Sequence, residues 1–183
     1  MQIKLLISDF DGTLVDTFES NYLAYHEAFA SQGLTLTREH YRNCFGMRFD
    51  DFMAASGITS EKVKEEIRHR KGECYPSYFS HLKVNHTLLN FIKSFHASGG
   101  KTAIASTARR KNLINALTHI DAISHFDLVL AGEDVSHGKP NPEIYLKALQ
   151  HFGYQPEEAL VFEDSEVGCT ASLSAHIPYI RII

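Results

Sequence analysis

Short apolar runs recur along the chain, and a segment of helix length separates most of them. The first covers 3–8 and is broken only by Lys4. The later runs are TAIAS, DLVLA, ALVFE and YIRII, at 102–106, 127–131, 159–163 and 179–183. Strands that are apolar on both faces are typical of a parallel sheet covered by helices on both sides. The pattern therefore predicts an α/β fold with a Rossmann-like core of three layers, α/β/α.

The segments between the later runs carry helix signals. Helices are expected over 86–98, 110–118 and 166–175. A further helix is expected to have Asn141 as its cap, Pro142 at its first position and Gly153 at its end.

The segment 15–84 interrupts this alternation directly after the first strand. Aromatic residues recur there at helical spacing, and Gly33 ends the pattern; they are Phe18, Tyr22, Tyr25 and Phe29. We expect this stripe to face a core. Further helices are expected over 37–44, 49–55 and 60–74. The segment is therefore predicted to be a helical cap domain, 15–84, inserted into a catalytic core formed by 1–14 and 85–183.

Composition limits the classes of function. With 183 residues, 44% hydrophobic and 22% charged, the chain resembles an ordinary globular protein. A net charge of -4 argues against nucleic acid or an anionic membrane as the main partner. Three unpatterned cysteines favour a reducing compartment and free buried thiols. Without a signal peptide or a membrane-spanning run, the protein is expected to be cytoplasmic. We expect it to be a monomer or a weak homodimer.

Polar residues follow the predicted strands at their carboxyl ends, where open α/β sheets bind ligands. Two of them, Asp9 and Asp11, lie one residue apart after the first strand. The full set is Asp9, Asp11, Thr13, Ser106, Thr107, Lys139, Glu163 and Asp164.

The charges of this set predict a bound cation. Four carboxylates and one lysine leave a net charge of -3, which a divalent ion would reduce to -1. Carboxylates without a convergent Cys/His set favour Mg²⁺. The sequence does not fit an EF-hand calcium loop that begins at Asp9, because the sixth position would be Leu14 rather than Gly and the twelfth Ser20 rather than Glu.

Each of these polar residues also has an ordinary structural interpretation when taken alone. A serine can end a strand, a loop lysine can be solvated, and acidic residues commonly begin helices. Their joint occurrence at successive strand ends favours a functional site.

Four motifs resemble those of the haloacid dehalogenase-like hydrolase superfamily. They are DFDGT, IAST, GKPNPEIY and VFEDSEVG, and their order and spacing match along nearly the whole chain. The helical insertion is similar to that of the subgroup with a small α-helical cap, which includes phosphoglycolate phosphatase, sugar-phosphate phosphatases and β-phosphoglucomutase.

The resemblance implies roles for the core residues. Asp9 would be the nucleophile, and Asp11 the general acid and base. Magnesium would be held by Asp9, Asp164 and the carbonyl of Asp11. Ser106 and the amide of Thr107 would hold phosphoryl oxygens.

Further roles follow from the same resemblance. Lys139 would pair with Asp9 and the transferring group, and Glu163 would order Lys139 or the metal's waters rather than bind metal directly. Thr13 would support the site. In the cap, Arg48 and Lys71 are expected to touch the distal end of the substrate.

These residues predict a magnesium-dependent phosphatase that hydrolyses a small phosphomonoester, a sugar phosphate or phosphoglycolate-like compound, through an aspartyl-phosphate. One alternative is a β-phosphoglucomutase-like mutase, although Asn21 stands where those enzymes carry histidine. Another is a non-catalytic protein that binds a phospho-ligand or a partner. A dehalogenase is disfavoured because that branch lacks an acid at the position of Asp11.

Two features depart from the family pattern. His176 stands where a glycine usually joins the last helix to the last strand. The sequence also ends at Ile183, earlier than relatives commonly do, so we expect either a compact variant or the absence of the last elements.

Overall fold

A computed structural model describes residues 2–183, which form two compact units. The sheet unit comprises the residues up to Asp16 together with Lys83–Ile183, and the helical unit is Thr17–Leu82. Both boundaries lie two residues inside the expected insertion, 15–84. The cause is a short antiparallel ribbon of β2 (Val15–Asp16) and β3 (Lys83–Val84), in which Val15 lies opposite Val84. This ribbon belongs to the sheet unit and was not predicted.

Within residues 2–183, the sheet unit contains a five-stranded sheet in the order β5-β4-β1-β6-β7, with every neighbouring pair parallel. The predicted α/β class is confirmed. Strand β6 (Ala159–Glu163) matches its apolar run, and β4 (Lys101–Ala105) is shifted from its run by one residue. The other strands are shorter than the runs that predicted them: β1 (Leu5–Ser8), β5 (Leu128–Leu130) and β7 (Tyr179–Arg181).

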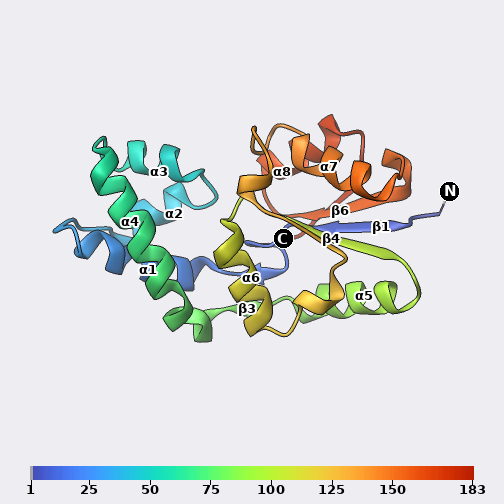
Figure 1. The fold of residues 1–183 in the computed structure, drawn as a ribbon, viewed down its shortest axis with the longest axis horizontal. Helices are drawn as coiled ribbons and strands as arrows, with labels where there is room; N and C mark the ends of the chain where they lie inside the picture. Colours follow the sequence, from blue (N-terminus) through green and yellow to red (C-terminus); the bar gives the residue numbers. More distant parts are fainter. Residues whose placement is uncertain (1) are drawn as a thin grey trace. The chain divides into compact units, whose positions relative to one another are not determined.

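The central strand is buried on both faces, as its apolar sequence requires. Leu5, Leu6 and Ile7 are at most 2% exposed. Leu5 and Ile7 pack with apolar residues of α7 (Glu143–Phe152) and α8 (Glu166–Ser174). In Figure 1 these two helices lie on one side of the sheet, and α5 (His86–Ala97) and α6 (Arg110–His119) lie on the other. Short 3₁₀ turns join the elements at Ile123–His125, Gly132–Asp134 and Pro156–Glu158.

Helix α7 begins later than the sequence predicted. Its first residue is Glu143, and Pro142 rather than Asn141 occupies the cap position. The side chain of Asn141 still accepts a hydrogen bond from the backbone N–H of Glu143, at 3.0 Å. Asn141 therefore satisfies a free N–H at the helix start from one residue further out. Gly153 follows the last turn in the left-handed conformation, as expected.

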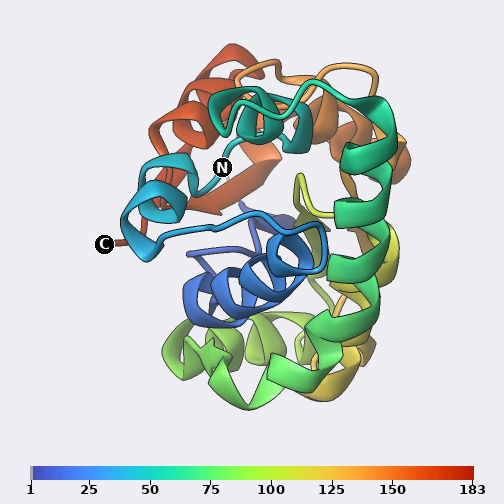
Figure 2. The same ribbon diagram turned by 90° about the vertical axis from the view of Figure 1, so that its left-hand side faces the viewer.

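The helical unit contains α1 (Phe18–Ala30), α2 (Arg38–Cys44), α3 (Phe49–Ala55) and α4 (Glu61–Cys74), followed by the unpredicted 3₁₀ helix η1 (Tyr75–His81). It is the blue-to-green part of the ribbon in Figure 2. Phe29 is buried in the core of this unit, and Phe18, Tyr22 and Tyr25 pack against that core. The aromatic stripe therefore faces a core, as predicted. The hydroxyls of Thr37 and Ser60 cap α2 and α4.

The thiols and the helix lengths of the described residues bear on two of the sequence-based expectations. The three cysteines, Cys44, Cys74 and Cys169, are buried free thiols. No helix in the described part of the chain is long and apolar enough to cross a lipid bilayer.

Helices α7 and α8 end in the same hydrogen-bonded motif with different residues. After α7, Gly153 donates to Gln150 and Tyr154 donates to Leu149. After α8, the N–H of His176 donates to the carbonyl of Leu173, and the N–H of Ile177 donates to the carbonyl of Ser172. This motif places one residue at positive φ, which is +69° for Gly153 and +60° for His176. Among the described residues, the only non-glycine residues at positive φ are His176 and Asp121.

Exchanging the residues at these two helix ends should shift stability in opposite directions. His176→Gly should raise the free energy of unfolding by about 1 kcal/mol, because glycine has no Cβ to strain at positive φ. Gly153→His should lower it by about the same amount, through backbone strain alone, since no atom lies within 4 Å of the added Cβ. Urea unfolding measures both, and a loss of stability in His176→Gly would contradict the strain argument.

Candidate active site

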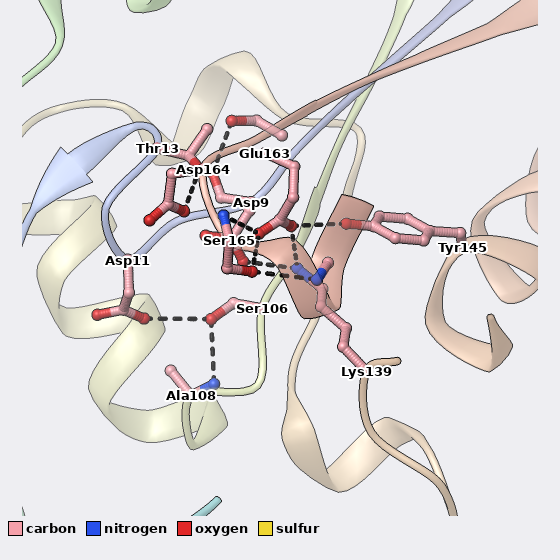
Figure 3. A network of polar contacts seen from close by, with 12 residues as sticks. Asp9, Asp11, Thr13, Ser106, Ala108, Lys139, Tyr145, Glu163, Asp164 and Ser165 are labelled. Atoms are coloured by element: carbon pink, nitrogen blue, oxygen red, sulfur yellow. Dashed lines mark hydrogen bonds and ion pairs between the residues drawn. The ribbon is translucent and has the colours of Figure 1, made fainter. Parts of the chain in front are cut away.

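The carboxyl ends of three strands bring the predicted polar residues together. Asp9 directly follows β1, Glu163 ends β6, and Ser106 directly follows β4. Because β1 lies between β4 and β6 in the sheet, these residues converge at one edge (Figure 3). The structure gathers there Asp9, Asp11, Thr13, Ser106, Lys139, Glu163 and Asp164.

A buried lysine joins two carboxylates at the centre of this site. The Nζ of Lys139 lies 2.7 Å from Oδ1 of Asp9 and 2.6 Å from Oε2 of Glu163. The side chain of Lys139 is only 4% exposed. Buried charges are stable only when paired and hydrogen-bonded, so this contact fixes all three side chains.

The loop before α7 places Lys139, and Glu143 holds that loop. The carboxylate of Glu143 accepts hydrogen bonds from the backbone N–H groups of Ser136 and His137, at 2.9 and 2.8 Å. Its partner Lys147 lies 2.9 Å away. These contacts, the Ser136 N–H foremost, lower the pKa of Glu143 to about 2. The first turn of α7 therefore anchors the segment from which Lys139 projects.

Glu163 has further hydrogen-bond donors that the sequence analysis missed. The hydroxyl of Tyr145 donates to Oε2 at 2.8 Å, and the hydroxyl of Ser165 donates to Oε1 at 2.7 Å. A Cβ at Gly168 would lie 2.0 Å from the Glu163 carboxyl carbon, so only glycine leaves room for it. These residues lie within the motifs GKPNPEIY and VFEDSEVG, but their spacing is that of ordinary helix positions. We call Asp9, Lys139, Tyr145, Glu163 and Ser165 the lysine network.

Asp11 lies beside the lysine network and contacts Ser106. The Ser106 hydroxyl donates to Oδ2 of Asp11 at 3.3 Å and accepts from the backbone N–H of Ala108 at 3.0 Å. Ser106 is buried, whereas Asp11 is partly exposed. This contact links the loop after β4 to the loop after β1.

The donor set fits a divalent cation. Carboxylate oxygens of Asp9, Glu163 and Asp164 lie within 4.8 Å of one another. Asp164 is held by the Thr13 hydroxyl, which donates to its Oδ1 at 2.8 Å. A Cβ at Gly12 would lie 2.3 Å from the Asp164 carboxylate, so glycine is required there too. Hard oxygen ligands of this kind suit Mg²⁺.

Burial and neighbouring charges shift the pKa values of these carboxylates and of Lys139. Burial raises the pKa of Asp9 well above its usual range, Glu163 and Asp11 add to the rise, and Lys139 opposes it. Burial also raises the pKa of Asp164, against its hydrogen bond from Thr13. Burial alone would lower the pKa of Lys139, but Asp9 and the other acidic neighbours outweigh it, and the pKa is raised. Lys139 therefore stays charged, but its single positive charge does not neutralise the three carboxylates of Asp9, Glu163 and Asp164.

The other candidate residues lie outside these contacts. Thr107 follows Ser106 with an exposed side chain. In the helical unit, Arg48 is exposed at the start of α3. Lys71 is buried there, with its Nζ 3.8 Å from the ring centre of Tyr75 and 5.2 Å from that of Tyr25. Lys71 thus makes cation–π contacts within its own unit.

Comparison with known proteins assigns the family. A model described as haloacid dehalogenase-like hydrolase matches residues 6–182, so the chain belongs to this family. The phosphorylated carbohydrates phosphatase of Thermotoga maritima is 30% identical over 181 residues, which span 96% of this chain and 82% of that protein.

Solved structures agree with this assignment. A variant of CbbY from Rhodobacter sphaeroides in complex with xylulose-(1,5)bisphosphate has a TM-score of 0.89 and 25% identity, over 98% of this chain and 86% of that one. A putative β-phosphoglucomutase from Thermotoga maritima has a TM-score of 0.75 and 28% identity, over 99% and 86%.

Mg²⁺ should stabilise the folded protein, because it offsets the buried negative charge. At ten times its dissociation constant, it should add roughly 1.4 kcal/mol to the free energy of unfolding, or about 3–6 °C in melting temperature. Asp164→Asn should lose most of this shift. Thermal unfolding with Mg²⁺ or K⁺ at equal ionic strength makes the measurement, and equal shifts in both proteins would exclude Asp164 as a ligand.

Proposed function

We propose that this protein is a magnesium-dependent phosphatase that acts on a small phosphorylated sugar through an aspartyl-phosphate. The observation that carries the proposal is the buried Asp9 carboxylate, held by Lys139 beside a second aspartate, Asp11. Membership of the hydrolase family and the names of its relatives support the same chemistry.

In the first step, a carboxylate oxygen of Asp9 attacks phosphorus, and the bond from phosphorus to the leaving oxygen breaks. Asp11 donates a proton to the leaving oxygen, so the alcohol departs neutral. Lys139 supplies positive charge as the transferring oxygens develop negative charge. A bound Mg²⁺, held by Asp9, Asp164 and the Asp11 carbonyl, would supply further positive charge to the phosphoryl oxygens.

In the second step, Asp11 takes a proton from water, whose oxygen attacks the phosphorus of the aspartyl-phosphate. The bond between phosphorus and the Asp9 oxygen breaks, which releases phosphate and restores the carboxylate. Splitting one difficult displacement into two steps suits a slow uncatalysed reaction. Ser106 and the Thr107 amide would hold phosphoryl oxygens in both steps, and Ser106 also contacts Asp11 directly.

The class of substrate is inferred from relatives. The Thermotoga maritima relative is named for phosphorylated carbohydrates, and the CbbY structure contains a phosphorylated sugar. We therefore infer a sugar phosphate rather than a phosphoglycolate-like compound. Arg48 and Lys71 remain the proposed contacts to the distal end of the substrate.

Replacing the nucleophile should abolish turnover. With an aryl phosphate and Mg²⁺, Asp9→Asn should lower kcat by at least about a thousandfold, because the amide cannot form the phosphoenzyme. Asp16→Asn is a matched control. Asp16 is an exposed aspartate that contacts Lys83 at 3.4 Å, and its loss should leave kcat within about twofold, as for most surface changes. Similar activity in wild type and Asp9→Asn would overturn the proposal.

A phosphosugar mutase is the second candidate, because one structural relative is named as a putative β-phosphoglucomutase. Such an enzyme must keep water from the aspartyl-phosphate until a second hydroxyl arrives. By resemblance, Asn21 stands where mutases of the β-phosphoglucomutase kind carry a histidine, and Asn21 cannot titrate near neutral pH. Asn21 is buried in α1, and its amide donates to the Thr17 hydroxyl at 3.0 Å.

Hydrolysis should therefore exceed isomerisation. Supplied with β-glucose 1-phosphate, Mg²⁺ and a trace of the bisphosphate, the enzyme should release inorganic phosphate faster than it forms glucose 6-phosphate. Enzyme-coupled assays follow both products in one reaction. Glucose 6-phosphate that accumulates well ahead of phosphate would establish the mutase.

A further inference from the structure

Tyr145 occupies a position in the site that neither the motifs nor the proposed chemistry explains. Its side chain is fully buried on α7, yet its hydroxyl points to the Glu163 carboxylate (Figure 3). Its ring also lies beside Lys139, with the Nζ 5.2 Å from the ring centre. A phenylalanine would fill the same apolar space, so the hydroxyl requires a separate explanation.

Glu163 has two possible roles in this site. One of its oxygens lies close enough to Asp9 and Asp164 to join a set of metal ligands. Its Oε2 already accepts from Lys139 and Tyr145, and its Oε1 accepts from the hydroxyl and the N–H of Ser165. A carboxylate has about four acceptor sites, so these four donors occupy them. These donors therefore favour Glu163 as a hydrogen-bonded partner of Lys139 rather than as a metal ligand.

Among these donors, the Tyr145 hydroxyl contributes most to keeping Glu163 with Lys139. Lys139 is shared with Asp9, and Ser165 also caps α8 by accepting from the N–H of Gly168 at 3.1 Å. In contrast, the Tyr145 hydroxyl is a neutral donor on a rigid, buried helix position, and it meets the same oxygen as Lys139. Because it takes part of the electron density of Oε2, it also weakens the hold of Glu163 on Lys139.

We propose that Tyr145 is a positioning residue: acting through Glu163, its hydroxyl keeps that carboxylate out of the metal's ligand set and leaves Lys139 available to Asp9 and the transferring phosphoryl group. The catalytic part of this inference rests on the proposed phosphatase function. The part that concerns Glu163 and the metal does not require turnover.

Tyr145→Phe tests this role while keeping the ring. Without the hydroxyl, Oε2 regains a free acceptor site, so Mg²⁺ should bind more tightly, by about tenfold if one charge-assisted contact is exchanged. Glu163 should also hold Lys139 more strongly, which should lower kcat for an aryl phosphate by up to about tenfold. KM should stay within about twofold, since the contribution of Lys139 increases in the transition state, when the transferring oxygens develop negative charge, rather than on substrate binding. Isothermal titration calorimetry with Mg²⁺ and steady-state kinetics give the three values.

A double-mutant cycle separates positioning from packing. In a Glu163→Gln background, Tyr145→Phe should change neither Mg²⁺ affinity nor kcat by more than about twofold, because the carboxylate through which it acts is gone. Equal effects of Tyr145→Phe in both backgrounds, or no effect in either, would overturn the inference. Ser165→Ala, which removes the hydroxyl donor from Oε1, should also tighten Mg²⁺ binding.

Tyr154→Phe is the matched control. Tyr154 packs against the same core cluster and also has a lysine beside its ring, with the Nζ of Lys4 5.7 Å from the ring centre. It lies outside the lysine network, and its change should leave all three values within about twofold of wild type. A wild-type protein that hydrolyses no phosphomonoester would end the proposed function, but the calorimetric cycle would still decide the role of Tyr145.

Discussion

The ion pair between Lys139 and its two carboxylates is the contact on which the rest of the site depends. Removing the lysine would leave Asp9 and Glu163 buried with like charges, at a cost of about 3–5 kcal/mol. The pair also sets the orientation of Asp9, which is the proposed nucleophile. The remaining acidic charge is not neutralised within the chain, which explains why a divalent cation fits the same place.

The arrangement of the strands in the sheet, together with the loop before α7, produces this contact. Adjacent parallel strands β1 and β6 place Asp9 beside Glu163, and the loop before α7 brings Lys139 between them. Two glycines then allow a close approach, Gly12 against Asp164 and Gly168 against Glu163. The sheet therefore provides the scaffold, and backbone positions without a Cβ provide the space for the carboxylates.

Much of this architecture was predictable from the sequence, because buried strands read as apolar runs and charged strand ends stand out. The β2–β3 ribbon was missed because two-residue strands leave no periodic pattern. Tyr145 was missed because its spacing with Ile144, Ala148 and Leu149 is that of a core-facing helix side, which it also is. Its hydroxyl contact depends on tertiary packing of α7 against β6, which local sequence does not encode.

Trapping the covalent intermediate tests the central claim most directly. Acid quenching during a single turnover of a phosphomonoester, followed by mass spectrometry of the peptides, locates any bound phosphoryl group. We expect one phosphoryl group on the peptide that contains Asp9, and its loss when the quenched protein is treated with hydroxylamine, which cleaves acyl phosphates. A phosphoryl group on another residue, or turnover with no phosphoenzyme at any quench time, would contradict it.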